Sequence, residues 1–323
     1  MIQKPKFAWH RDTDVQDLKV KDWIETDATC RDKWDATLLG VPFSRASISA
    51  SGASEFPDAF RRSWELFTTY YIDEMVDFRE LSIVDLGDVT LHATDVTTSH
   101  AHIEAAMTTV LEAHPVSLHT TIGGDHSITA PIVRALASKH PHKRIGIVQF
   151  DTHLDMRDFT NGRTNGTPIR QLVEEGIVSG RNIYNIGLHG FYNALSLIEA
   201  ATKHEINIIT LKEMRKTGVK ATIAQVFNQL SKDVDLIYVT VDIDVLDVAY
   251  APGVPSATPG GMHSDELFEL LFEIGKYHIT AIDFVCIDPL RDVAMQTVKA
   301  TTYAYLTFMA STYLHHFRNN SPN

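Results

Sequence analysis

Residues 145–155 read IGIVQFDTHLD, six largely apolar residues followed at once by a dense run of polar ones. The apolar part, 145–150, is short and does not alternate, which is typical of a strand that helices cover on both faces. In open parallel sheets, ligands bind beyond the carboxyl ends of the strands. The stretch therefore predicts an α/β fold in which the functional residues follow the strands.

The same arrangement recurs along the chain. Seven further short apolar runs are predicted strands, at residues 36–41, 82–86, 117–122, 182–187, 206–210, 236–241 and 280–286. Segments with apolar residues three and four apart lie between most of them and are predicted helices, at 101–113, 128–139, 169–175, 194–203, 221–230 and 265–276. This alternation indicates crossover helices that join eight parallel strands.

The composition bounds the organisation of the chain. Of its 323 residues, 44% are hydrophobic and 22% are charged, as in ordinary globular proteins. No linker or repeat divides the series of strands, so we expect one α/β catalytic domain over residues 35–323, preceded by a more polar N-terminal extension, 1–34, lying over the surface. The uncharged segment 300–314 is shorter than the ~20 apolar residues of a membrane span and is predicted to be a buried helix.

The net charge limits the classes of partner that this protein can bind, and the cysteine content indicates its compartment. The formal net charge of −12 has the wrong sign for binding nucleic acid or anionic lipid. Cys30 and Cys286 stand far apart without a CxxC pair, so we expect neither a disulfide framework nor a thiolate zinc site. Charges throughout the first twenty residues argue against a signal peptide. A cytoplasmic protein acting on a small molecule is the prediction.

Three residues of metal-ligand type follow the strand at 145–150. Asp151, His153 and Asp155 stand at i, i+2 and i+4, which puts their side chains on one face of extended backbone. A solvated polar turn is the alternative, but such turns usually contain Gly, Pro or Asn. We interpret this run as part of a metal site.

Two other predicted strands end in similar residues. Asp242 and Asp244 follow the strand at 236–241, and His126 lies in the segment GGDHS, 123–127, after another strand. A capped turn explains the glycine segment adequately, but it explains two carboxylates two residues apart poorly. Buried like charges at this spacing repel unless a cation or a shared proton holds them together.

The whole set favours a pair of metal ions. Four carboxylates balance two divalent cations, and oxygen and nitrogen donors without thiolate favour Mn²⁺, with Zn²⁺, Co²⁺, Ni²⁺ and Fe²⁺ as competitors. Two such ions lower the pKa of a shared water toward neutrality, so the site is predicted to catalyse hydrolysis. The predicted ligands are His126, Asp151, His153, Asp155, Asp242 and Asp244.

GGDHS at 123–127, DTHLD at 151–155 and DIDVLD at 242–247 resemble the motifs of the ureohydrolase superfamily, which includes arginase, agmatinase and formimidoylglutamase. The resemblance covers most of the chain and implies a three-layer α/β/α domain with an eight-stranded parallel sheet, two Mn²⁺ ions per subunit and a homo-oligomer. It also implies how the ligands divide. His126, Asp151, Asp155 and Asp242 would hold one metal, and Asp151, His153, Asp242 and Asp244 the other.

Three positions depart from the arginase and agmatinase pattern. Asn165 stands where that pattern has a histidine that assists proton transfer, and Cys286 where it has a glutamate that binds the guanidinium group. The loop at 186–193 offers no carboxylate to bind a substrate ammonium group. The residues that would bind a cationic substrate in the arginase and agmatinase pattern are therefore missing from this sequence.

Arginines stand near the second motif instead. Their guanidinium groups can bind carboxylates through two parallel hydrogen bonds, although Arg170 is expected to be structural because it lies at the start of a predicted helix. Arg157, Arg163, Asn165 and Cys286 are the predicted substrate contacts. This set favours an anionic amidine, N-formimidoyl-L-glutamate, which would be hydrolysed to L-glutamate and formamide in histidine degradation.

Asp155 is the predicted catalytic residue, taking a proton from the attacking hydroxide and passing it to the leaving nitrogen. Three alternatives stay open. The chain could hydrolyse a guanidino compound such as agmatine, guanidinobutyrate or arginine, or it could keep the fold without catalysis. A thiolate nucleophile at Cys286 is a further option, but no histidine is evidently placed beside it.

Overall fold

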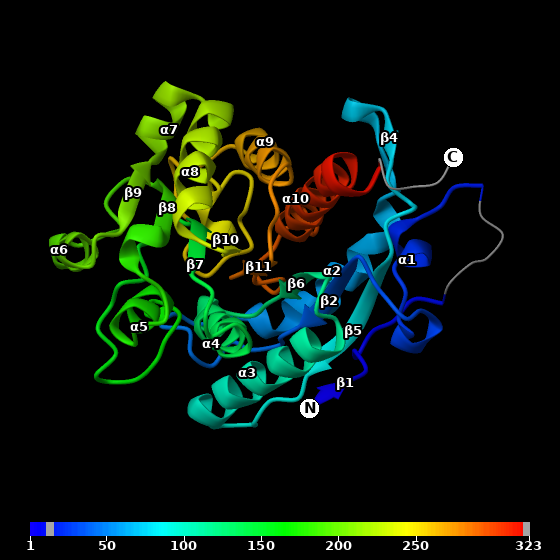
Figure 1. The fold of residues 1–323 in the computed structure, drawn as a ribbon, viewed down its shortest axis with the longest axis horizontal. Coiled ribbons are helices and arrows are strands. Elements are labelled where there is room, and N and C mark those ends of the chain that lie inside the picture. The colour runs from blue at the N-terminus through cyan, green and yellow to red at the C-terminus, as the bar shows by residue number, and fades with distance from the viewer. Residues whose placement is uncertain (11–15, 319–323) are drawn as a thin grey trace.

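The computed structural model describes residues 1–10 and 16–318, and a nine-stranded sheet crosses it in the order β1-β5-β2-β6-β11-β10-β7-β8-β9 (Figure 1). Eight strands run parallel and match the eight predicted ones. The ninth, β1 (Ile2–Gln3), pairs antiparallel with β5 at one edge and is too short to leave a periodic pattern in the sequence. The parallel strands are β2 (Ala36–Gly40), β5 (Ile83–Val89), β6 (Leu118–Ile122), β7 (Ile145–Phe150), β8 (Ile183–Leu188), β9 (Asn207–Thr210), β10 (Leu236–Asp242) and β11 (Ala281–Val285).

Helices cover both faces of the sheet, so the predicted α/β/α layering is confirmed (Figure 1). One face is packed by α3 (Val96–Ala113), α4 (Thr129–Lys139), α5 (Pro168–Glu174) and α6 (Leu195–Lys203). The other is packed by α1 (Val20–Trp23), α2 (Phe56–Ser63), α7 (Leu211–Thr217), α8 (Val219–Asp233), α9 (Ser264–Ile274) and α10 (Gln296–Thr312).

Strand β7 shows why the apolar runs do not alternate. Val148 and Phe150 belong to the hydrophobic cluster on one face of the sheet, and Ile145 and Ile147 to the cluster on the other. All four side chains are buried. Because helices cover both faces of the sheet, the side chains that point to either face are apolar.

Helix α2 was not predicted, and its burial pattern explains why. Arg61 points inward from this helix and interrupts the apolar stripe by which a helix is recognised. Its guanidinium is buried against Asp85 (Nε to Oδ2, 2.6 Å) and Asp88 (Nη1 to Oδ1, 2.8 Å). The attraction of these carboxylates outweighs burial, so the pKa of Arg61 rises and the group stays charged.

Helix α7 was also not predicted, and other differences concern helix ends and the N-terminal segment. Helix α3 begins before residue 101, because Asp95 caps it by accepting from the Thr98 amide at 2.6 Å. Val20, Trp23 and Ile24 are buried in the core, so residues 1–34 do more than lie over the surface. A small hairpin, β3 (Tyr70–Tyr71) and β4 (Val76–Asp77), stands apart from the main sheet. None of the helices in the described parts is long and apolar enough to cross a membrane.

Candidate metal centre

Three loops bring the predicted ligands together, and each follows a strand of the central sheet. Strands β6, β11, β10 and β7 are neighbours in that order, so the loops after β6, β10 and β7 meet at one edge. His126 lies in a short 3-10 turn just after Gly123 and Gly124. A Cβ atom on Gly124 would overlap the backbone carbonyl of Phe43, so the close approach of the two segments requires glycine.

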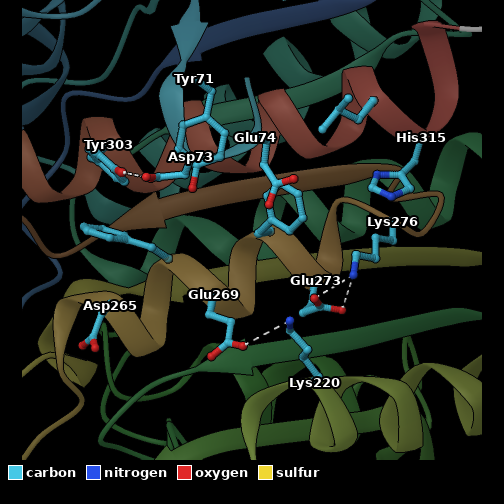
Figure 2. Close-up of a pocket in the computed structure, with 13 residues that line it drawn as sticks. Tyr71, Asp73, Glu74, Lys220, Asp265, Glu269, Glu273, Lys276, Tyr303 and His315 are labelled. Carbon is cyan, nitrogen blue, oxygen red and sulfur yellow. Dashed lines mark hydrogen bonds and ion pairs between the residues drawn. The ribbon is translucent and has the colours of Figure 1, made fainter. Parts of the chain in front are cut away.

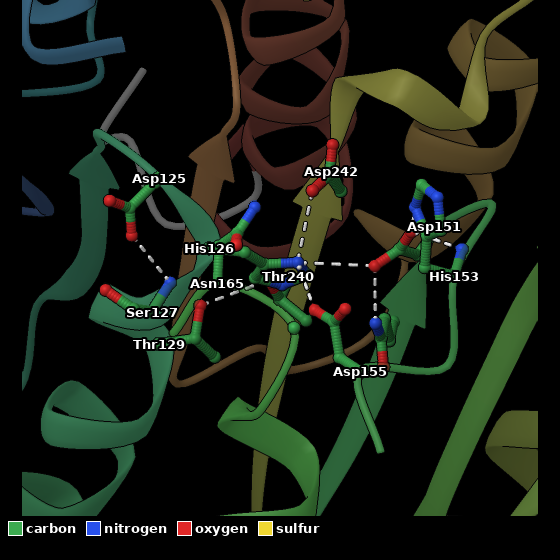
Figure 3. Close-up of polar contacts among 12 residues, drawn as sticks. Asp125, His126, Ser127, Thr129, Asp151, His153, Asp155, Asn165, Thr240 and Asp242 are labelled. Carbon is green, nitrogen blue, oxygen red and sulfur yellow. Dashed lines mark hydrogen bonds and ion pairs between the residues drawn. The ribbon is translucent and has the colours of Figure 1, made fainter. Parts of the chain in front are cut away.

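His126 is surrounded by carboxylates (Figure 3). Its Nδ1 atom lies 2.8 Å from Asp155 Oδ2, 3.1 Å from Asp242 Oδ2 and 3.2 Å from Asp151 Oδ2. All four side chains are buried. These atoms converge on one point, as the ligands of a single cation do.

His153 forms the second group. Its Nδ1 atom lies 3.0 Å from Asp244 Oδ2 and 3.4 Å from Asp151 Oδ1. Asp151 therefore turns one oxygen toward His126 and the other toward His153. That placement is the geometry a carboxylate needs to bridge two ions.

The local backbone differs from the extended run that the spacing of residues 151–155 predicts. Asp155 has φ 53°, in the left-handed region, so the chain curls back after Leu154. His153 and Asp155 consequently face different partners, Asp244 and His126, instead of lining one face. Strain of this kind in a non-glycine residue is often held at functional sites.

The cluster of charges is costly unless cations balance it. Burial, together with repulsion from Asp244 and Asp151, raises the pKa of Asp242 to about 8. Burial and the charge of Asp151 raise the pKa of Asp155 to about 6. Although burial alone would lower it, the surrounding carboxylates raise the pKa of His126 well above its ordinary value. Buried carboxylates this close together need a cation or a shared proton to offset their repulsion.

Unsatisfied polar atoms mark the same point. His126 Nδ1 and Asp155 Oδ2 are buried and make no well-formed hydrogen bond among the described residues. Three groups of potential ligand atoms lie close enough to hold an ion: His126 with Asp151 and Asp155, Asp151 with His153 and Asp244, and His126 with Asp242 and Cys286. The third group places a histidine near Cys286, which the sequence did not reveal. The residues present therefore fit a binuclear metal centre.

A cavity of about 100 Å³ opens onto the centre. Ligand side chains form its floor, and residues from loops after several strands form its walls. The lining comprises Ile48, Ser49, His153, Asp155, Arg157, Asn165, Gly166, Tyr192, Leu197, Asp242, Asp244, Pro255, Ser256 and Cys286.

A larger cavity of about 740 Å³ lies elsewhere, between the β3–β4 hairpin and helices α8, α9 and α10 (Figure 2). Its two lysines already face glutamates, Lys276 with Glu273 at 2.7 Å and Lys220 with Glu269 at 3.9 Å. None of the candidate ligand groups found in residues 1–10 and 16–318 lines it. The larger volume of this cavity therefore does not make it the reactive site, since the candidate metal ligands line the smaller one.

The three arginines occupy different environments. Arg157 is exposed, lines the cavity over the metal centre and makes no ion pair with any residue that the structure describes. Arg163 donates from Nη2 to Glu175 Oε1 at 2.7 Å, and Arg170 from Nε to Glu174 Oε1 at 2.7 Å. Arg157 is thus the guanidinium that is free to bind an anion at the mouth of the site.

A known protein family matches most of the chain. The model of the arginase family matches residues 34–311. The chain belongs to the arginase family. A formimidoylglutamase of Halalkalibacterium halodurans is 39% identical over 84% of this chain and 85% of its own length.

Solved arginase-family structures agree. The crystal structure of formimidoylglutamase from Bacillus subtilis superposes with a TM-score of 0.90 at 33% identity, covering 98% of this chain and 97% of that one. Formiminoglutamase of Trypanosoma cruzi with Mn²⁺ gives a TM-score of 0.83 at 25% identity, over 92% and 99% of the two chains.

Asn165 and Cys286 line the cavity of this arginase-family chain, but both are engaged in the structure of its walls. Asn165 Oδ1 accepts from the Ile48 amide at 2.9 Å, so this side chain fixes the wall formed by Ile48. Cys286 is buried with φ 68°, and its amide donates to Gly124 O at 2.8 Å. Burial raises the pKa of the Cys286 thiol well above its ordinary value, which disfavours the thiolate nucleophile.

Sequence reasoning missed several residues of the wall. Tyr192 stands edge-on to His153, with ring centroids 6.4 Å apart, and Ser49 and Ser256 complete the rim. Tyr192 lies in the loop at 186–193, which attracted notice only for lacking a carboxylate. The sequence offers one indication of its role, because Tyr192 lies in the segment that follows the predicted strand at 182–187.

Proposed function

We propose that this chain hydrolyses N-formimidoyl-L-glutamate to L-glutamate and formamide at a centre of two Mn²⁺ ions. The observation that carries the proposal is the pairing of two kinds of group in one cavity. Four of the six candidate ligands, His153, Asp155, Asp242 and Asp244, line its floor, and the unpaired guanidinium of Arg157 stands at its wall. The similarity to formimidoylglutamases supports the same substrate.

The cavity disfavours a guanidinium substrate. Its described lining contains three carboxylates, those of Asp155, Asp242 and Asp244, and all three belong to the metal centre. Cys286 stands where a guanidinium would need an acid, and its thiol stays protonated. An amidine with a carboxylate tail matches this arrangement better, because the tail can pair with the Arg157 guanidinium.

The reaction adds water across the amidine carbon and breaks its bond to the glutamate nitrogen. The metal ions, when bound, supply a water activated for attack. Asp155 lines the cavity, and its carboxylate is placed to hold the proton released from that water. It then delivers the proton to the departing nitrogen, so that glutamate leaves as the amine and the amidine carbon leaves as formamide.

Arg157 and the cavity walls orient the substrate. The Arg157 guanidinium can bind a substrate carboxylate through two hydrogen bonds. Tyr192 and Leu197 close the side of the cavity toward α6. Their apolar surface limits the access of bulk water to the amidine carbon.

One assay separates the candidate functions. The Mn²⁺-loaded protein is incubated with N-formimidoyl-L-glutamate, agmatine and arginine in parallel, and formamide, glutamate and urea are measured. We expect formamide and glutamate from the first compound alone. Urea as the main product would establish a guanidino hydrolase, and no product from any compound would support a non-catalytic member.

The proposal extends to the setting of the enzyme. We place it in the cytoplasm, in histidine degradation, as a homo-oligomer. The reduced cysteines, Cys30 and Cys286, and the exposed Ile48, Phe191 and Leu290 are consistent with this setting. Light scattering after size-exclusion chromatography gives the subunit number, and a monomer at micromolar concentration would contradict the oligomer.

A further inference from the structure

A buried chain of hydroxyl groups lies behind His126, on the side away from the other ligands. His126 Nε2 is 2.9 Å from Thr240 Oγ1, and Thr240 stands directly across from Asp283 in the pairing of β10 with β11. Asp283 Oδ2 accepts from Thr129 Oγ1 and from Tyr238 Oη, each at 2.6 Å. Figure 3 shows Thr129 and Thr240 beside the imidazole.

Every member of this chain is removed from solvent. Asp283 and Thr240 are 0% exposed, and Thr129 and Tyr238 are equally buried. Burial raises the pKa of Asp283, while the attraction of His126 and the neighbouring hydroxyls oppose the rise. Two hydroxyls, those of Thr129 and Tyr238, donate to its Oδ2 atom, and Thr240 Oγ1 lies 3.5 Å from Thr129 Oγ1.

The direction of these hydrogen bonds decides which nitrogen of His126 is protonated. A threonine hydroxyl has one proton to donate, and Thr129 donates its proton to the Asp283 carboxylate, which leaves Thr129 Oγ1 to accept from Thr240 Oγ1 at 3.5 Å. Thr240 Oγ1 is then left to accept from His126 Nε2–H. In neutral imidazole this leaves Nδ1 as a lone pair directed toward Asp155, Asp242 and Asp151.

The opposite direction would disable the ligand. If the Thr240 proton went to Nε2, the imidazole proton would sit on Nδ1 and point at the position where a cation would bind. Histidine ligands usually donate their other ring N–H to a carboxylate or carbonyl, which fixes the tautomer. Here a hydroxyl stands between the imidazole and the carboxylate.

We infer that Asp283 and Thr240 are positioning residues that fix the metal-binding tautomer of His126. Asp283 acts through the Thr129 and Thr240 hydroxyls and does not line the cavity. The inference rests on the metal centre proposed above, and it adds residues that carry none of the metal-ligand motifs.

Manganese affinity is the appropriate readout, because it does not depend on the substrate. Four variants are titrated with Mn²⁺, and free metal is followed by electron paramagnetic resonance. Thr240→Val and Asp283→Asn should weaken binding by about 10–100-fold, the range typical of lost outer-shell partners. Thr240→Ser keeps the hydroxyl and should retain the affinity of the wild type.

Thr120→Val is the matched control. Thr120 is also a buried strand threonine, and its hydroxyl makes no hydrogen bond within the described residues. The substitution removes the same atom without touching the chain behind His126, so manganese affinity should not change.

Two results would overturn the inference: manganese affinity of Thr240→Val within threefold of the wild type, or an equal loss in Thr120→Val. If Asp283→Asn does not fold, the comparison of Thr240→Val with Thr240→Ser decides alone. A wild-type protein that binds no Mn²⁺ would refute the proposed metal centre itself. Wild-type binding with unaffected variants would refute the tautomer inference only.

Discussion

Replacing Arg157 by methionine tests the substrate assignment most directly. The substitution keeps an unbranched stem of similar bulk and removes the charge that lines the cavity. Hydrogen bonds to charged groups contribute about 1.5–3 kcal/mol. Because Arg157 is exposed, the lower part of that range applies, about 1.5–2 kcal/mol. At 1.4 kcal/mol per factor of ten, kcat/KM for N-formimidoyl-L-glutamate should fall about 10–30-fold.

The loss should appear mainly in KM, because a carboxylate at the tail of the substrate is held alike before and during the reaction. Arg163→Met is the control, since Arg163 is already paired with Glu175 and does not line the cavity. Steady-state release of glutamate is the assay for both variants. A change of less than threefold in Arg157→Met, or an equal loss in Arg163→Met, would refute the reasoning.

Three more expectations follow. Asp155→Asn should retain bound manganese, measured by elemental analysis, but lose about 10²–10⁴-fold in kcat because the amide cannot carry the proton; full turnover would remove that role. Cys286→Ser should keep kcat within about threefold, since general acid–base and metal chemistry need no thiolate; abolished turnover with metal still bound would revive the nucleophile. Burial lowers the pKa of His119 from 6.5 to about 4, so the unfolded chain binds its proton first as pH falls. The metal-free wild type should therefore lose about 2 kcal/mol more unfolding free energy than His119→Gln between pH 7.5 and pH 5, measured by urea denaturation, and parallel pH profiles would contradict this.

The parallel sheet was predictable because its strands are buried on both faces. Ile145 to Phe150 carries that pattern through six consecutive buried positions. Helix α2 was not predicted because Arg61 is buried in ion pairs with Asp85 and Asp88. The periodicity of a segment does not reveal that its charged residue has partners elsewhere in the chain. Strand β1 was not predicted because two residues are too few to show an alternating pattern.

The convergence of the candidate ligand side chains was predictable because they cluster in three short motifs at strand ends. The cavity walls were not, since Ser49, Tyr192 and Ser256 come from loops whose conformation depends on tertiary contacts. The three arginines look alike in the sequence, and only the positions of Glu174 and Glu175 separate the paired ones from Arg157. The role of each arginine therefore depends on which carboxylates the folded chain brings near it.

The short strand β1 has a consequence for how the protein behaves in concentrated solution. It lies along β5, where the Thr90 amide also donates to Met1 O at 2.8 Å. Gly87, with φ 90°, admits the Gln3 carbonyl at a place that a Cβ atom would block. Without this cover, β5 would offer free amides and carbonyls as a template for pairing with another molecule. Residues 1–3 thus protect this edge of the sheet from pairing with another molecule.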